Sequence, residues 1–70
     1  MIKKLNILVV FGGKSAEHEI SVLSARSVAA ALPPEKYNVF LAGISRNGRW
    51  VIGSQAKLAL DKGVVEDSEE

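Results

Sequence analysis

The chain has 70 residues, 47% of them apolar, with a formal net charge of +1 and no cysteine. This length allows one small domain of marginal stability, and the lack of cysteine excludes disulfides and thiolate metal sites and fits a reducing, cytoplasmic setting. Scattered lysines and arginines without interleaved aromatics argue against a nucleic-acid surface, and no apolar run approaches the ~20 residues of a membrane span.

The first expected element is a strand over residues 6–11, with the sequence Asn-Ile-Leu-Val-Val-Phe. The run is β-branched and aromatic and does not alternate with polar residues, which is typical of a parallel strand covered on both faces. Gly12 and Gly13 end the strand. The run is too short for a secretory leader, and no small-residue cleavage site follows it.

A helix is expected from about Glu19 to Leu32, where Pro33 and Pro34 stop it. Glu17 and Glu19 suit the positive end of its dipole. Helical spacing predicts one apolar face for this helix. That face comprises Ile20, Leu23, Ser27 or Val28, and Ala31.

A second strand is expected over residues 37–44, which completes a βαβ unit with the first strand and the helix. Asn47-Gly48 is a strong hairpin signal and predicts a short antiparallel strand over residues 50–52. We expect Trp50 to pack this hairpin against the sheet. The fold class is therefore α/β, with parallel strands and a short hairpin strand.

A short helix is expected over residues 55–62, capped by Ser54, ended by Gly63 and with Leu58 on its buried side. Residues 1–63 are interpreted as one domain. Residues 64–70 are interpreted as an acidic tail, because half of the eight acidic residues lie in the last five positions. We expect this tail to be disordered or to mark a truncation point.

The segment from Gly12 to Ser21 joins the first strand to the helix, at the edge where open α/β sheets bind ligands. Glu17 lies in this turn, and its carboxylate is suited to an ammonium group. It could equally be a first-turn acid that complements the helix dipole. Ser15 and Ser21 are interpreted as capping or helix-face hydroxyls.

Two other motifs in this turn are rejected. Gly13-Lys14-Ser15 lacks the earlier glycine of a phosphate-binding loop, because that position is Leu8. Glu17-His18-Glu19 has no second histidine in the chain, and adjacent helical residues point to different faces. The three are interpreted as polar residues on the surface of a helix start, and no metal site is expected.

At these residues the sequence resembles the amino-terminal end of D-alanine–D-alanine ligases. The resemblance rests on Val-Phe-Gly-Gly-Lys-Ser-Ala-Glu-His-Glu-Ile-Ser over residues 10–21, and on the Gly-Ile and Asn-Gly-x-Trp pattern over residues 43–50. It implies a Rossmann-like domain that precedes the ATP-grasp domains of such enzymes. It also implies an ATP- and Mg²⁺-dependent ligase that makes the D-alanyl dipeptide of peptidoglycan.

The same resemblance implies that Glu17 is a catalytic-site residue that binds the ammonium of the first D-alanine. It also implies that Ile20 lines the pocket of this substrate, and that Gly12 and Gly13 let the backbone pass close by. The partners it implies are D-alanine and the ATP-grasp domains, which the chain lacks. We therefore expect the chain alone to be an inactive part of a ligase that binds neither ATP nor Mg²⁺.

Two alternatives remain open. The chain could be a standalone α/β module that forms a homodimer through an edge strand without catalysis. It could also derive from another ATP-grasp enzyme that binds a different amino acid, since Glu17 recognises an ammonium and says little about the side chain.

Overall fold

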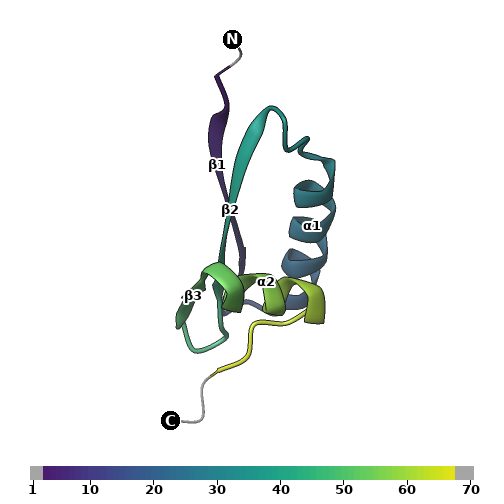
Figure 1. Cartoon of the computed structure of the whole chain (residues 1–70). Coiled ribbons are helices and arrows are strands. Elements are labelled where there is room, and N and C mark those ends of the chain that lie inside the picture. The colour runs from purple at the N-terminus through teal and green to yellow at the C-terminus, as the bar shows by residue number, and fades with distance from the viewer. Residues whose placement is uncertain (1–2, 68–70) are drawn as a thin grey trace.

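A computed structural model of the chain describes residues 3–67. They form strand β1 (Leu5–Gly12), helix α1 (His18–Ala31), strands β2 (Tyr37–Ile44) and β3 (Trp50–Ile52), and helix α2 (Gly53–Lys62). Figure 1 shows α1 running alongside the two long strands, with α2 at the end of the molecule where β1 ends and α1 begins. The expected α/β class is confirmed.

The described strands form one sheet in the order β1-β2-β3. β1 and β2 are parallel, in a register that runs from Leu5 opposite Tyr37 to Gly12 opposite Ile44. β3 is antiparallel to the last residues of β2, with Trp50 opposite Ile44. The predicted βαβ unit and the hairpin strand are both present.

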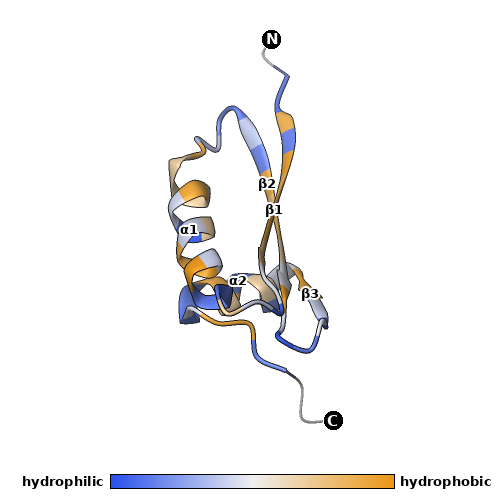
Figure 2. Cartoon of the chain, turned by 180° about the vertical axis from the view of Figure 1, so that it is seen from behind, coloured by the Kyte–Doolittle hydropathy of each residue, from blue (hydrophilic) through white to orange (hydrophobic). Residues whose placement is uncertain are grey.

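The helices cover one face of the sheet. Val9 and Phe11 of β1 share a core with buried residues of both α1 and α2. Leu8, Val10 and Phe40, which alternate with them on the strands, remain about half exposed. The prediction that β1 is covered on both faces is therefore wrong for residues 3–67, and Figure 2 shows the apolar character of the two long strands.

Helix α1 uses a different face from the predicted one. Its buried residues are His18, Val22 and Ala25, with Ala29 partly buried behind them. This stripe follows the i, i+4, i+7 spacing of a helix, and its alanines let the backbone approach the sheet closely. The large apolar residues of the predicted face are exposed: Ile20, Leu23 and Val28.

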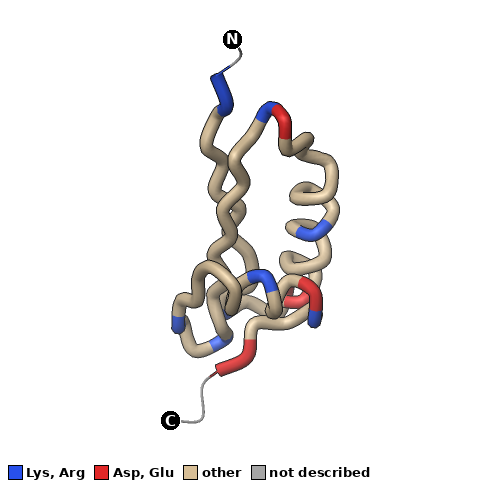
Figure 3. Tube along the Cα trace, in the orientation of Figure 1, with Lys and Arg blue, Asp and Glu red and all other residues tan. Residues whose placement is uncertain are grey.

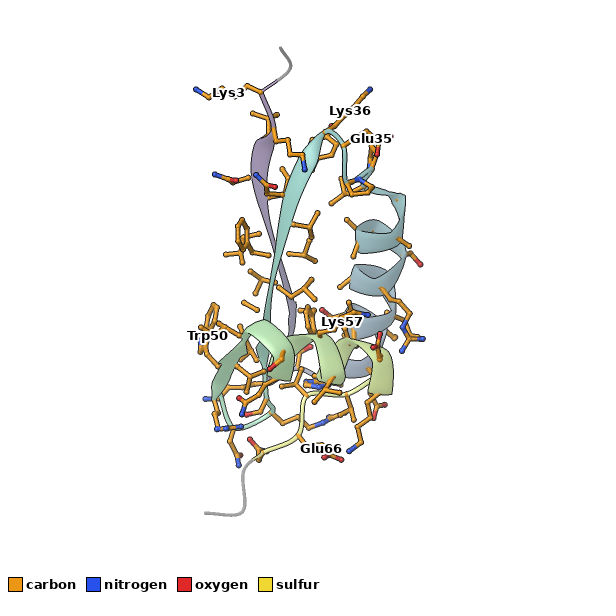
Figure 4. All side chains as sticks on the ribbon, in the orientation of Figure 1. Lys3, Glu35, Lys36, Trp50, Lys57 and Glu66 are labelled. Carbon is orange, nitrogen blue, oxygen red and sulfur yellow. The ribbon has the colours of Figure 1, made fainter. Side chains whose placement is uncertain are left out.

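The hairpin turn forms as predicted at Asn47-Gly48. The Gly48 N–H donates to the Ser45 carbonyl at 3.0 Å, and the Arg49 N–H donates to Ser45 Oγ at 3.0 Å. Trp50, however, is exposed, because the alternation along β3 turns Val51 into the core instead. Figure 4 shows the Trp50 side chain at the outer edge of β3, away from α1.

Helix α2 begins earlier than expected. Its N-cap is Ile52 without a side-chain capping bond, so Ser54 lies inside the helix and the predicted cap is wrong. Gly63 ends the helix as predicted, and its N–H donates to the Ala59 carbonyl at 2.9 Å. Leu58 is exposed instead of buried, because α2 turns a different stripe toward the core. That stripe comprises Ala56, Ala59 and Leu60.

The described part of the predicted tail contacts the domain. Val65 is 2% exposed and belongs to the core cluster, so it lies with the folded unit although it follows the predicted boundary at residue 63. The Asp67 carboxylate accepts a hydrogen bond from the Asn47 N–H at 3.3 Å. Residues 68–70 of the predicted tail lie outside the described residues.

We expect Val65→Ala to lower the free energy of unfolding by about 2 kcal/mol, because the substitution removes two buried side-chain carbons and leaves a cavity. Val28→Ala is the matched control, since Val28 is half exposed on α1 and alanine favours a helix. Urea titration followed by circular dichroism measures both. Equal stability of the two variants would show that the segment after α2 does not belong to the core.

Candidate functional site

The turn after β1 is held by hydrogen bonds from two neighbouring elements. The Gly12 N–H donates to Ser21 Oγ of α1 at 3.1 Å, and the Gly13 N–H donates to the Ile44 carbonyl of β2 at 2.7 Å. Both glycines have positive φ, 93° and 105°. A Cβ on Gly12 would also collide with the Ile44 carbonyl oxygen. Only glycine fits at this position.

Glu17 is the N-cap residue of α1 and is exposed. Its N–H donates to Ser15 Oγ at 3.0 Å, and its carbonyl accepts from the Ser21 N–H at 2.9 Å, so its backbone is held on both sides. Its carboxylate makes no capping hydrogen bond, and among residues 3–67 it takes part in no ion pair. The charge is therefore free to bind a cationic group.

Ile20 lies one turn further along α1 and is 58% exposed. Residues three apart are neighbours on a helix, so Glu17 and Ile20 present a carboxylate and an apolar side chain next to each other. The neighbouring acid, Glu19, differs from Glu17, because its carboxylate pairs with the Arg46 guanidinium at 3.4 Å.

His18 is fully buried, so its interpretation as a surface residue of the helix start is wrong. The Val65 N–H donates to His18 Nε2 at 3.0 Å, and His18 Nδ1 lies 2.7 Å from the Gly13 carbonyl. Nε2 must accept from an N–H, so the proton is on Nδ1, which donates to Gly13. The spacing of His18 from Val22 and Ala25, four and seven residues, could have indicated in the sequence that His18 lies on the buried face of α1.

The candidate site lies where β1 and β2 both end, at the carboxyl edge of the parallel pair. Hollows of about 260, 600 and 420 Å³ on the described surface are lined by other residues, most of them in the sheet, the helices and the segment after α2. Two basic residues lie close to this turn: Lys14 belongs to it and its side chain lies near Gly48, and Arg46 of the hairpin pairs with Glu19. The other basic residues are spread along residues 3–67 (Figure 3).

No cluster of three or more His, Asp or Glu side chains suited to a metal ion is found over residues 3–67. Within the same range, neither α1 nor α2 is long and apolar enough to cross a bilayer.

Comparison with known proteins identifies the family. The family model described as the D-ala D-ala ligase N-terminus matches residues 6–70. The chain belongs to the D-alanine–D-alanine ligase family. The ligase of Deinococcus radiodurans is 48% identical over 61 residues, which are 87% of this chain and 18% of that protein. The ligase of Halothermothrix orenii is 45% identical over 65 residues, which are 93% of this chain and 19% of that protein.

Solved structures of D-alanine ligases share the fold. The VanG D-Ala:D-Ser ligase of Enterococcus faecalis superposes with a TM-score of 0.76 at 32% identity, over 97% of this chain and 20% of that one. The D-alanine–D-alanine ligase of Coxiella burnetii gives 0.72 at 40% identity, over 83% and 17%. The chain thus spans about a fifth or less of the ligases that it matches.

The four residues singled out from the sequence lie along the connection from β1 to α1. Gly12 ends β1, Gly13 follows it, Glu17 is the N-cap of α1, and Ile20 lies in the first turn of α1. Sequence reasoning missed two residues that hold this turn, Ser21 as a hydrogen-bond acceptor for Gly12 and His18 as a donor to Gly13.

Proposed function

We propose that the chain is the N-terminal substrate-binding part of an ATP-dependent D-alanine–D-alanine ligase of peptidoglycan synthesis, a cytoplasmic activity. The observation that carries this proposal is the Glu17 carboxylate, which is exposed and makes no ion pair among residues 3–67, in a turn matched by the ligase family model. A carboxylate in that position can accept hydrogen bonds from the ammonium of a D-alanine.

Each neighbouring residue has a distinct part in this proposal. Ile20 offers an apolar surface for the methyl group of D-alanine, next to the carboxylate that binds its ammonium. The glycine turn, which carries no side chains, lets the substrate approach the backbone. These residues bind and orient the amino acid, and none of them is proposed to move a proton.

The residues that the structure describes offer no evident place for ATP or Mg²⁺. Residues 3–67 contain no carboxylate cluster for Mg²⁺, and the glycine turn lacks the spacing of a phosphate-binding loop. We therefore assign ATP and Mg²⁺ to the remainder of the ligase. There, ATP would supply the phosphoryl group that activates the D-alanine carboxylate.

The isolated chain is expected to bind D-alanine too weakly for catalysis. One carboxylate–ammonium contact contributes about 1.5–3 kcal/mol. Association costs exceed this amount, so the dissociation constant of the half-site lies well above the millimolar range. Closure of other domains would be needed to exclude water and fix the geometry.

A chimeric ligase tests the proposal. In it, this chain replaces the matching N-terminal stretch of the Deinococcus radiodurans relative, and phosphate and dipeptide are assayed with ATP, Mg²⁺ and D-alanine. We expect dipeptide synthesis by the chimera and no D-alanine-dependent ATP hydrolysis by the chain alone. A folded but inactive chimera, or hydrolysis by the chain alone, contradicts the proposal.

One observation favours the alternative of a self-associating module. β1 is an edge of the described sheet, and the sheet face bearing Leu8, Val10 and Phe40 is exposed. In our proposal the remainder of the ligase covers this apolar face; in the alternative, a second copy does. Analytical ultracentrifugation separates the two, because a stable dimer unaffected by Glu17→Gln favours the module.

A further inference from the structure

The buried imidazole of His18 joins three segments that meet behind the candidate site. It is the first residue of α1, its Nδ1 donates to the Gly13 carbonyl at 2.7 Å, and its Nε2 accepts from the Val65 N–H at 3.0 Å. Its ring also packs against Gly12, where a Cβ would come within 3.1 Å of His18 Cε1. No other side chain of residues 3–67 hydrogen-bonds both the glycine turn and the segment after α2.

We propose that His18 is a positioning residue of the substrate site: its Nδ1–H fixes the Gly13–Lys14 peptide and thereby places the turn that carries Glu17. The proposal rests on the proposed function of Glu17. His18 itself is buried and faces away from solvent, so it would act on substrate only through this turn.

The need for such a bond follows from the glycines. A peptide next to glycine can adopt either of two opposite orientations at little cost, because no Cβ opposes positive φ. In a trans peptide the carbonyl and the following N–H point in opposite directions. The bond to His18 turns the Gly13 carbonyl into the core and therefore turns the Lys14 N–H away from it.

The residues between this peptide and Glu17 are hydrogen-bonded to the start of α1. The Ser15 carbonyl accepts from the His18 N–H at 3.1 Å, and Ser15 Oγ accepts from the Glu17 N–H at 3.0 Å. Lys14, Ser15 and Ala16 are all exposed, and the short path from Gly13 to Glu17 consists of these three residues alone. A rotation of the Gly13–Lys14 peptide would thus redirect the whole turn. His18 is also the residue after Glu17, so its anchored ring holds the turn at both ends.

The ring orientation is set by the third segment. The Val65 N–H can only donate, so it requires an unprotonated Nε2 and leaves the proton on Nδ1 for Gly13. The described residues contain no buried side-chain nitrogen or oxygen without a partner, so neither ring nitrogen is left unsatisfied. Val65 therefore selects the tautomer that holds the turn.

Two conservative variants of His18, tested in the chimeric ligase, remove its bond to Gly13 or its bond to Val65 one at a time. The amide of His18→Asn can donate near the position of Nδ1 and keep the Gly13 bond, whereas the oxygen of His18→Gln can accept near Nε2 and keep the Val65 bond. We expect His18→Asn to leave the KM for D-alanine close to the parent value. We expect His18→Gln to raise it about tenfold or more, with the KM for ATP unchanged in both.

Unfolding curves of both variants show whether a change in KM merely follows lost stability. A rise in KM that is as large for His18→Asn as for His18→Gln, or that tracks stability, overturns the positioning role. If the unsubstituted chimera is inactive, the proposed function fails, but the role of His18 is still decided on the isolated chain.

Nuclear magnetic resonance of the isolated chain gives that independent decision. The long-range ¹H–¹⁵N spectrum of the imidazole is expected to show a protonated Nδ1 and an unprotonated Nε2, and the opposite tautomer overturns the proposal. Because both substitutions remove the ring current of His18, hydrogen exchange is compared instead of signal position: the Glu17 N–H, which is bonded to Ser15 Oγ, should exchange faster in His18→Gln than in His18→Asn. Equal exchange rates of this amide in both variants also overturn it.

Discussion

Glu17→Gln in the chimeric ligase is expected to raise the KM for D-alanine by about 10- to 100-fold. Glutamine keeps the size of the side chain but loses the charge, so the substrate ammonium loses an ion partner worth about 1.5–3 kcal/mol. The KM for ATP should change little, because ATP is assigned to the remainder of the ligase. Steady-state assays of dipeptide synthesis with each substrate varied in turn measure both constants.

Glu19→Gln is the matched control for this prediction. It removes the same charge two residues away, and the ion pair that it breaks with Arg46 is exposed and contributes little to stability. We expect near-parental constants for this variant. An equal rise in KM for both variants would mean that Glu17 acts only through the general charge of the helix start, as a dipole-complementing acid would.

Gly12→Ala is expected to destabilise the domain by about 3–5 kcal/mol, through backbone strain and overpacking together. Alanine at this φ of 93° is strained, and its Cβ would collide with the Ile44 carbonyl oxygen, which cannot move without disturbing β2. Small domains have little stability to lose, so most of the chain should be unfolded. Circular dichroism and urea titration measure the effect.

Gly13→Ala measures the effect of backbone strain without the steric collision that Gly12→Ala adds. Gly13 also has positive φ, but a Cβ there would meet no atom within 4 Å. We therefore expect a loss of about 1–3 kcal/mol from backbone strain alone. If the two variants lose equal stability, the close packing of β1, β2 and His18 around Gly12 does not contribute, and the glycine is needed for its conformation only.

Much of the fold could be predicted from local patterns. The apolar runs and the Asn47-Gly48 turn located the three strands, and the prolines and Gly63 located the ends of both helices. The faces of these elements could not be predicted in the same way. Leu23, Leu58 and Trp50 are apolar and were expected to face the interior, yet all three are exposed.

These faces were mispredicted because hydrophobicity shows only which residues can be buried. Which of them are buried depends on how the elements pack against one another. Helix α1 has apolar residues around much of its circumference, and the close approach of two helices to a short sheet favours the stripe with the alanines. The exposed apolar residues of the uncovered sheet face follow from the same selection, since both helices pack into a single core.

The sequence by itself determined the class of the fold, the glycine turn and the acid within it, because these depend on residues that are neighbours in the chain. Only the tertiary structure decided the role of His18. Its partners, Gly13 and Val65, are 5 and 47 residues away, and no local pattern specifies such contacts. Because the ring is buried, both of its nitrogens must be hydrogen-bonded. These bonds connect His18 to the glycine turn and to Val65, and so His18 helps to hold the candidate site in place.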